Sequence, residues 1–379
     1  MQMIGFAFYI AFILFLISPS PRTTLKQSLD VQRFDERDIM FARARYKSGT
    51  KAFEDYYKRY PGKKRIDNEI RSLPDLSSPG GKYYDSHKSY RVNLFFSETE
   101  HLAGRVDGEK AGQKINITPD SAAKELKSMV HSLGAVDSGI AEVRPEYVYT
   151  HVGRGDGKYG DRISLDHPWA LVFAVEMRYE RVHQAPNVPI TLESGEKYLQ
   201  AAHMAVTIAA YIRSLGYEAR AHVDGNYRLI LPALGYSAGL GEIGRLGYLI
   251  HPVYGARIRL GAVSTKLPLV KDRPYEFGVQ DMCRICKKCA SNCPAGAISF
   301  SDVRNIRGVY KWSTHQESCY RYWRKAGTDC GLCMRVCPYS KPNTLIHYLI
   351  RKVVSRSNAA RYLAVKADNL FYGHPGHFV

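Results

Sequence analysis

Cysteine is missing from the first 282 residues of this 379-residue chain and from every position after residue 337. All eight cysteines therefore lie in one segment, from Cys283 to Cys337. Disulfide bonds and zinc sites are the two ordinary explanations for such a group. Disulfides do not require the same spacing twice, and zinc sites rarely carry a proline after the last ligand. The segment is instead typical of a module that holds iron–sulfur clusters and transfers electrons.

Two cysteine runs make up this segment. The first reads Cys283-x2-Cys286-x2-Cys289-x3-Cys293-Pro294, the bacterial ferredoxin pattern in which the fourth thiolate reaches a second cluster. The second reads Cys319-x10-Cys330-x2-Cys333-x3-Cys337-Pro338, so its first ligand is displaced. Two [4Fe–4S] clusters need eight thiolates. We predict that one cluster binds Cys283, Cys286, Cys289 and Cys337, and that the other binds Cys293, Cys319, Cys330 and Cys333.

Basic residues are absent before the apolar run from Met3 to Ile17, and no twin-arginine pair precedes it. A cleaved signal peptide, the competing interpretation, has a charged start and a small-x-small cleavage site, which residues 17–21 do not provide. The run is somewhat short for a bilayer, which usually takes about 20 residues. Positive residues follow it, at Arg22 and Lys26. We expect a membrane anchor over residues 1–21, with the body on the cytoplasmic face.

Acidic residues are outnumbered by basic ones, 36 against 54, which gives a net charge of +18. Three partners would suit this charge: nucleic acid, an anionic membrane surface, or an acidic electron donor. An ordinary solvated basic surface is the fourth explanation. The basic residues are spread along the chain, so the charge alone does not choose among these explanations.

Residues 22–116 show little regular pattern. They are polar and rich in tyrosine, with loop-like sequence at 72–81, and we expect them to wrap over a partner domain. Regular pattern begins after Ile117. It predicts a helix from Thr118-Pro119 to Leu133 and a second from Ser194 to Leu215, with strands over 138–143, 169–175 and 218–223. Helices packed on a sheet predict an α/β or α+β domain over residues 117–270.

A glycine cluster follows, in which Gly239-Leu-Gly241-Glu-Ile-Gly244 matches the GxGxxG fingerprint of dinucleotide-binding proteins. Two requirements of that fingerprint are missing. Pro232 and Gly235 occupy the place of the preceding strand, and no acid lies about 20 residues further on. We therefore reject NAD binding. Glycine also allows close approach of a large flat group, so Gly239, Gly241, Gly244 and Gly247 are candidate cofactor-binding residues. A ligand-free turn is the alternative.

The stretch from Gly239 to Val263 resembles the corrinoid-binding region of reductive dehalogenases. Residues 265–271 and Phe277-Gly278-Val279, just before the first cysteine run, are similar to the same family. So is the widened second run, with Tyr322-Trp323 and Gly327-Thr-Asp-Cys330-Gly-Leu-Cys333. The resemblance spans residues 117–345, about three fifths of the chain.

This resemblance implies an α+β fold. A nitroreductase-like corrinoid-binding domain over 117–270 would be followed by a bacterial-type 2[4Fe–4S] ferredoxin domain over 271–345 and a basic C-terminal tail over 346–379. It also implies a cobamide bound base-off, and no Asp-x-His-x-x-Gly motif for a lower protein ligand occurs. The clusters would reduce the cobalt, which would act on a carbon–halogen bond or a similar electrophile.

The proton donor in the family is a tyrosine with polar or cationic neighbours. By position along the motif, the resemblance implies Tyr198 as the donor, with Asn226 and Arg257 as supports, while Arg259 is a second candidate for the cationic role. A guanidinium beside a phenol stabilises the anion that remains after proton transfer. Packing is the plain alternative for Tyr198, because the chain has 27 tyrosines.

The resulting prediction is a membrane-anchored, corrinoid-dependent oxidoreductase. Its electron donor would be an acidic ferredoxin, a flavodoxin or a membrane redox protein, and its substrate a small electrophile such as an organohalide. Two other functions stand beside it. The related epoxyqueuosine reductases act on tRNA; the positive charge favours that reading and the apolar N-terminus opposes it, so we do not expect nucleic acid as the partner. A dicluster electron carrier without a cobamide is the third possibility.

Overall fold

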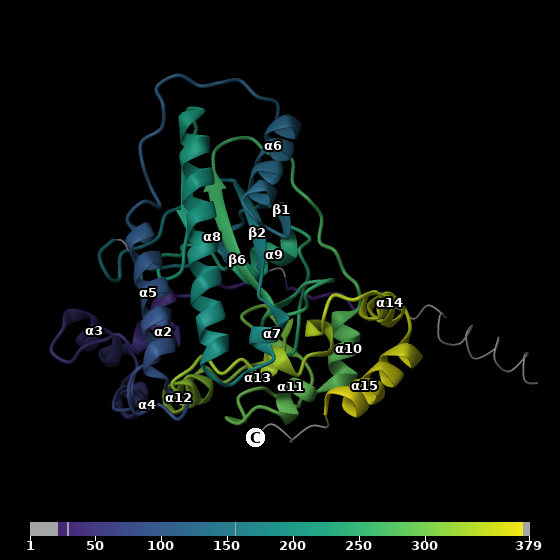
Figure 1. Cartoon of the computed structure of the whole chain (residues 1–379). Helices are drawn as coiled ribbons and strands as arrows, with labels where there is room; N and C mark the ends of the chain where they lie inside the picture. The colour runs from purple at the N-terminus through teal and green to yellow at the C-terminus, as the bar shows by residue number, and fades with distance from the viewer. Residues whose placement is uncertain (1–21, 29, 156, 374–379) are drawn as a thin grey trace, which may run out of the picture.

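A four-stranded antiparallel sheet in the order β1-β2-β6-β3 lies at the centre of the computed structural model, which describes residues 22–28, 30–155 and 157–373 (Figure 1). The strands are β1 (Asp137–Glu142), β2 (Trp169–Glu176), β3 (Ala219–His222) and β6 (Ile258–Thr265). Neighbouring strands pair antiparallel throughout this sheet. The domain is therefore α+β, in agreement with the predicted class of fold.

Both faces of the sheet are covered, which explains why β2 reads as an unbroken apolar run. Leu171, Phe173 and Val175 point to one face and pack in a core with α6 (Pro119–Ser132) and α8 (Val188–Ser214). The alternate residues, such as Val172, point to the other face and pack against α9 (Leu231–Ser237). Alternation along a strand thus produces two separate cores from one sequence.

The two predicted helices of this domain are present, and one begins earlier than expected. In α6, the Thr118 hydroxyl caps the N-terminus by accepting from the Ser121 N–H, as the sequence indicates. Helix α8 starts at Val188, with Asn187 as its N-cap, so the prediction of Ser194 as the cap is wrong. Ser194 lies nearly two turns inside the helix, and its hydroxyl donates to the carboxylate of Asp329.

Residues 22–116 contain four helices and a short 3-10 turn rather than irregular chain. These are η1 (Glu36–Asp38), α2 (Met40–Arg43), α3 (Lys51–Arg59), α4 (Pro61–Arg71) and α5 (Ser86–Ala103). Helix α5 packs along α8, and α4 packs on α12 (Gln316–Ala326). The region therefore contacts both the sheet domain and the segment that carries the cysteines.

The cysteine segment is built from short helices beside two small hairpins. They are α10 (Val279–Cys286), α11 (Lys288–Ser291), α13 (Leu332–Arg335) and η3 (Pro338–Ser340), with the hairpins β4–β5 (Glu242–Ile243, Leu249–Ile250) and β7–β8 (Arg304–Ile306, Val309–Lys311). The remaining short elements are η2 (Pro145–Tyr147) and α7 (Tyr179–Val182). Two further helices, α14 (Leu345–Val354) and α15 (Asn358–Tyr372), occupy the predicted basic tail. Helix α15 packs on α10.

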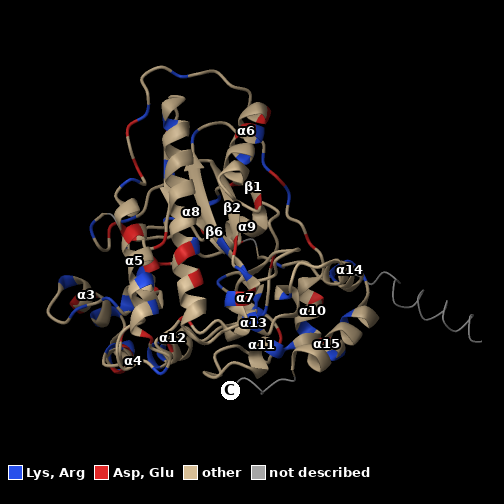
Figure 2. Cartoon of the chain, viewed as in Figure 1, with Lys and Arg blue, Asp and Glu red and all other residues tan. Residues whose placement is uncertain are grey.

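Figure 2 shows positions of Lys and Arg distributed along the ribbon of both the sheet domain and the cysteine segment, with positions of Asp and Glu among them. The described helices include none with the length and apolar character needed to cross a bilayer. The anchor predicted over residues 1–21 lies outside the described residues.

Candidate functional site

Four cysteine side chains gather between α10, α11 and η3. The pKa of Cys286 is raised to about 12, mainly by burial and also by the neighbouring thiol of Cys337, against the effect of the Lys288 N–H. The pKa of Cys289 is raised well above its usual value by burial and by the thiols of Cys283, Cys286 and Cys337. Cys337, from the second run, thus lies with the first three cysteines of the first run.

The other four cysteines gather around α12 and α13. Burial raises the pKa of Cys319 to about 11, helped by the thiol of Cys293. The pKa of Cys333 is raised well above its usual value by burial and then by Cys330, Cys319 and Cys293. The eight thiols therefore lie near one another, with Cys337 beside the first run and Cys293 beside the second. The division of the eight ligands between two clusters stays a prediction.

Backbone N–H groups point at these sulfurs. The Arg245 N–H donates to Cys283 Sγ at 3.4 Å, and the Ala297 N–H donates to Cys293 Sγ at 3.3 Å. A buried thiol resists ionisation, but iron binding replaces its proton, and hydrogen bonds to the bound sulfur help to set the reduction potential. Each group of four is therefore suited to a [4Fe–4S] cluster, and all eight cysteines are free of disulfides.

Tyr198 and Arg259 form the polar centre between the sheet and α8. The guanidinium carbon of Arg259 in β6 lies 5.0 Å from the centre of the Tyr198 ring on α8. Arg259 also donates to Ser194 Oγ at 2.6 Å and lies 3.5 Å from the carboxylate of Asp329. Asp329 immediately precedes the ligand Cys330. One short chain of contacts thus connects the phenol with a cysteine of the second group.

Two more tyrosines lie near this centre. The pKa of Tyr227 is raised well above its usual value by burial and then by Asp224 and Tyr198. The pKa of Tyr248 is raised likewise, by desolvation first and then by the thiols of Cys333 and Cys319. Although 37 % of Tyr248 is exposed, its hydroxyl is enclosed by protein atoms. Sequence reasoning missed both residues, since nothing in a tyrosine-rich chain marks them out.

The pKa of Tyr198 is raised by burial, while the positive charge of Arg259 acts in the opposite direction. A phenol with a raised pKa keeps its proton throughout the neutral range. Arg259 is itself enclosed, which strengthens its interaction with any anion that forms on Tyr198. The pair can therefore deliver a proton and stabilise the phenolate that remains.

Arg257 is not part of this centre. Its side chain is fully buried, with Nε donating to the Ser340 carbonyl at 2.8 Å and Nη1 to Glu176 Oε1 at 3.1 Å. It lies over the ring of Tyr179, not that of Tyr198. Of the two cationic candidates in the sequence, the structure brings only Arg259 to Tyr198. Arg257 instead connects the start of β6 to the η3 segment.

Asn226 is fully buried beside this region. Its Oδ1 accepts from Arg220 Nη2 at 2.8 Å, and its Nδ2 donates to the Ala103 carbonyl at 3.2 Å. These contacts fix the turn after β3 and so position the next residue, Tyr227, near Tyr198. The described contacts place Asn226 as a support of that turn, and its predicted role at the phenol stays a prediction.

The candidate glycines line the β4–β5 hairpin and are packed closely against protein. A Cβ on Gly239 would lie 2.6 Å from the Arg273 carbonyl oxygen, and one on Gly241 would lie 2.1 Å from that of Ile250. A Cβ on Gly244 would lie 2.8 Å from the Ile250 side chain and 3.6 Å from Cys283 Sγ. Gly247 has a φ of +84° and lies beside Thr314. Backbone packing near the first cysteine group accounts for these glycines, and their role in cofactor binding stays a prediction.

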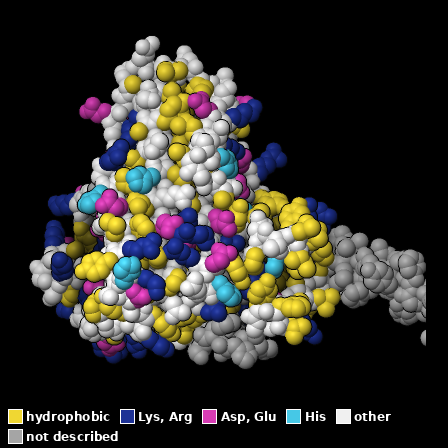
Figure 3. Space-filling model, in the orientation of Figure 1, with side chains coloured by type: hydrophobic (Ala, Val, Ile, Leu, Met, Phe, Trp, Pro, Cys, Tyr) yellow, Lys and Arg dark blue, Asp and Glu magenta, His cyan; other side chains and the backbone are white. Residues whose placement is uncertain are grey.

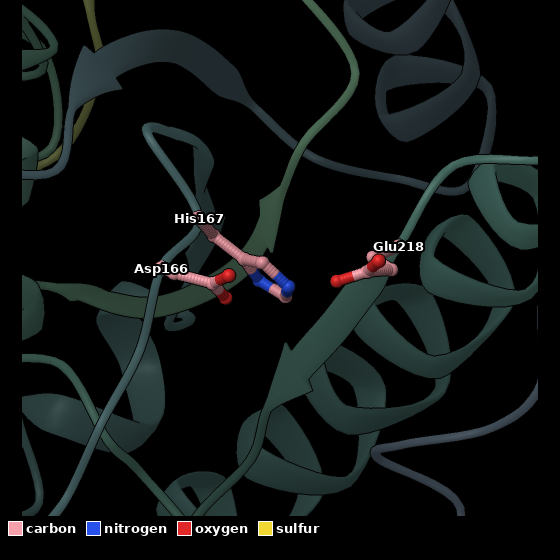
Figure 4. A group of neighbouring side chains, drawn as sticks. All are labelled: Asp166, His167 and Glu218. Atoms are coloured by element: carbon pink, nitrogen blue, oxygen red, sulfur yellow. The ribbon is translucent and has the colours of Figure 1, made fainter.

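Asp166, His167 and Glu218 form the one group of metal-ligand type that stands apart from the cysteines in the described chain (Figure 4). Lys266 Nζ lies 2.6 Å from Asp166 Oδ2 and 2.8 Å from Glu218 Oε2. Its ammonium group is ion-paired with both carboxylates, so this group is a salt-bridge cluster at the sheet edge.

The fold and the cysteine groups define a class of protein: an α+β domain joined to a two-cluster ferredoxin module. Residues 282–341 match the protein-family model described as a 4Fe-4S dicluster domain. The chain is 38 % identical over 217 residues to the tetrachloroethene reductive dehalogenase of Desulfitobacterium hafniense, covering 54 % of this chain and 39 % of that protein. It is 34 % identical over 211 residues to that of Sulfurospirillum multivorans, covering 54 % and 42 %.

Among solved structures, the catabolic reductive dehalogenase NpRdhA in complex with 3-bromo-4-hydroxybenzoic acid aligns with a TM-score of 0.76 at 25 % identity, covering 93 % of this chain and 48 % of that one. An epoxyqueuosine reductase of Lactococcus garvieae is 30 % identical over 118 residues, 30 % of this chain and 32 % of that protein. The predicted resemblance to reductive dehalogenases is confirmed, and so is the prediction of a two-cluster module. The chain spans about two fifths of the length of the two dehalogenases.

Proposed function

We propose that this protein is an oxidoreductase of the reductive dehalogenase type, in which two [4Fe–4S] clusters supply electrons to a cobamide. The observation that carries the proposal is the position of the Tyr198–Arg259 pair. The guanidinium that lies over the protonated phenol also lies next to Asp329, one residue from the predicted cluster ligand Cys330. Electrons and a proton can therefore reach the same place.

Two features of the centre suit a large cofactor that carries polar groups. Within the described chain, the buried Nε of Arg259 has no hydrogen-bond partner, although its Nη2 donates to Ser194 Oγ. Tyr248 leaves 37 % of its surface exposed beside Arg259 and Tyr198 and close to Cys319 and Cys333. Buried polar atoms without partners cost free energy, so a ligand that pairs with Nε would be favoured. Arg259 and Tyr248 would contact a cobamide here.

When bound, a cobamide supplies a low-valent metal that takes up electrons and reacts with an electrophilic carbon or its halogen. The protein groups have separate tasks. Tyr198 holds the proton that the reduced product needs, Arg259 stabilises the phenolate, and Ser194 and Asp329 hold Arg259 in place. The substrate is an organohalide or a similar small electrophile, by analogy with the names of the related proteins.

The partner and the location belong to the same proposal. An acidic ferredoxin, a flavodoxin or a membrane redox protein would deliver electrons, favoured by the net charge of +18. Residues 1–21 would anchor the chain, with its body on the cytoplasmic face. Deleting these residues should release the protein from membranes with its metal content unchanged, and a C-terminal reporter should give a cytoplasmic signal. A periplasmic signal would reverse the orientation.

Anaerobic purification after supply of a cobamide tests the enzymatic proposal directly. We expect a corrinoid absorbance together with about eight irons per chain, the content of two [4Fe–4S] clusters. Reduced protein should then release halide from a panel of organohalides. Eight irons without bound corrinoid would instead support an electron carrier. Activity on tRNA and not on organohalides would support the epoxyqueuosine reductase alternative, which the match to that enzyme favours.

A further inference from the structure

Helices α14 and α15 form a hairpin whose outer surface is apolar. Nine of the twenty large hydrophobic side chains that are exposed in the described chain belong to it, five on α14 and four on α15. They are Leu345, Ile346, Tyr348, Leu349 and Ile350, then Tyr362, Leu363, Leu370 and Phe371. In Figure 3, hydrophobic side chains cluster where these helices lie in Figure 1. An exposed patch of this kind marks an interaction surface.

The exposed residues are not the inward-facing stripe of ordinary surface helices. The hairpin already has a buried side, formed by Val354, Ala360, Arg361 and Asp368, and α15 rests on α10 through it. The outer positions repeat at helical spacing, with Leu345 and Leu349 one turn apart. Each helix is therefore apolar on the side that faces away from the protein, where polar residues normally lie.

The exposed charges of the hairpin have one sign. Lys352, Arg356 and Lys366 are exposed, whereas Asp368, the one acidic residue from 342 to 373, is buried and ion-paired with Lys288 and Lys341. Apolar side chains beside basic ones, without a free carboxylate, are typical of helices that lie in the headgroup region of anionic bilayers. The charge therefore selects an anionic lipid surface as the occupant.

The hairpin also lies where the described chain begins. The Thr23 hydroxyl donates to Asp281 Oδ1 at 2.6 Å, and Arg361 of α15 lies 3.6 Å from Asp281 Oδ2. Arg22 donates to the Glu276 carbonyl at 2.9 Å. The apolar run of residues 3–17 precedes this point in the sequence by a few residues. A bilayer that received this run would therefore be close to the hairpin.

We propose that the α14–α15 hairpin lies on an anionic lipid bilayer. Its outer side chains enter the boundary between headgroups and acyl chains, and Lys352, Arg356 and Lys366 contact lipid phosphates. This second contact orients the body on the membrane and does not depend on the reaction that the protein catalyses.

Hydrogen–deuterium exchange on the full-length holoprotein tests this proposal. The protein is measured without lipid at two concentrations, with phosphatidylcholine vesicles, and with vesicles that also contain phosphatidylglycerol. We expect amides of residues 345–372 to exchange at least about fivefold more slowly with the anionic vesicles only, since each basic residue near such a surface contributes about 1 kcal/mol. Equal protection by neutral vesicles, or none with either, would overturn the proposal.

Protection without lipid would also overturn it. If that protection rises with protein concentration, a second copy of the chain covers the hairpin. If it is independent of concentration, another segment of the same chain covers it. Anchoring through residues 1–21 is read separately, from flotation of the protein with the vesicles, so failure of one contact does not obscure the other.

Matched variants test the side chains themselves. Leu349→Glu places a carboxylate on the outer face of α14, and Leu94→Glu places one on α5; the two leucines are 52 % and 54 % exposed. Both variants should fold, because neither leucine is buried. We expect Leu349→Glu to remove the lipid-dependent protection of α14 and Leu94→Glu to leave it within about twofold. An equal response of the two variants would show that the hairpin has no special role.

Discussion

The guanidinium of Arg259 lies over the ring of Tyr198, with its central carbon 5.0 Å from the ring centre. Arg259 comes from β6 and Tyr198 from α8, and the two elements pack directly against each other. An enclosed cation over an aromatic ring is attracted to it by about 2 kcal/mol or more. Arg259 therefore connects the phenol of Tyr198 to Asp329, the residue before Cys330.

Tyr198→Phe should separate proton delivery from electron supply. The ring and its contact with Arg259 remain, so cluster content and corrinoid content should be unchanged. Turnover should fall by about 10²–10⁴-fold, the usual contribution of a positioned general acid. Halide release under single-turnover conditions measures the effect. Full activity in this variant would exclude Tyr198 as the donor.

Arginine-to-lysine substitutions should distinguish the two cationic candidates. Arg259→Lys keeps the charge and loses the planar guanidinium above the ring, so turnover should decrease while thermal stability changes little. Arg257→Lys removes a buried donor from the carbonyls of Ser340 and Met177, so it should cost about 1–3 kcal/mol of stability and largely preserve turnover. Thermal unfolding and turnover are measured on both variants. We expect Arg259→Lys to lower turnover mainly and Arg257→Lys to lower stability mainly. The opposite pattern would return the cationic role to Arg257.

Cys319→Ser should damage one cluster and spare the other. Cys319 lies with Cys293, Cys330 and Cys333, so electron paramagnetic resonance of the reduced protein should lose one of two signals. Cys337→Ser should disturb the other cluster, although Cys337 follows Cys333 closely in the sequence. Loss of the same signal in both variants would contradict the exchange of ligands between the two runs.

Mild acid should weaken the sheet through His222. Burial, and then the charge of Arg220, lower the pKa of this imidazole well below its usual value of about 6.5. Its Nδ1 accepts from the Arg228 N–H at 3.2 Å, a bond that protonation breaks. The unfolded chain therefore binds a proton that the folded chain does not, so this contribution is complete above pH 6.5 and decreases below it.

From pH 6.5 to 5.5 we expect about 1 kcal/mol of destabilisation from this residue. Apparent thermal midpoints across this range should fall in the wild-type protein and fall less in His222→Gln. An equal fall in both would assign the acid sensitivity to other groups.

Several elements could be predicted because the residues that stabilise them are close together in the sequence. Helix α6 has a capping threonine and a proline in its first turn, and β2 is apolar from Trp169 to Val175 because both of its faces are buried. The start of α8 could not be predicted in this way. Its first two turns bury Glu193 and Ser194, which pair with Arg178 and Asp329, so polar residues occupy positions where a hydrophobic pattern is expected.

The same reasoning explains what was missed outside the sheet. Helix α5 buries Ser89 and Thr99 as well as Val92 and Leu102, so its inner face does not read as apolar. The sequence of α14 and α15 is interpreted as a basic tail. In the structure these residues form two helices, and many of their large hydrophobic side chains face outward and do not enter a core.

At the candidate site, cysteine spacing was sufficient to predict a module with two [4Fe–4S] clusters, while the sharing of ligands between the two runs stays a prediction. The choice between Arg257 and Arg259 required the structure. Arg257 lies just before β6 and Arg259 lies within it, two residues further on, so the sequence alone does not distinguish them. In the sheet, Arg259 pairs with Val175 of β2, and this register places Arg259 under α8. Tyr227 and Tyr248 reach the centre from turns that no local pattern specifies.

The contacts of the N-terminal region set an order of events during synthesis. Ser28 pairs with Gly308, Arg43 with Glu317, and Ser77 with Gly327, so these contacts of the N-terminal region form only after the cysteine segment has been synthesised. Domains usually fold from the N-terminus as the ribosome proceeds. Helix α5 can pack on α8 earlier, but the contacts with the cysteine segment can form only after that segment has emerged, which leaves an interval in which the thiols remain open to cluster delivery.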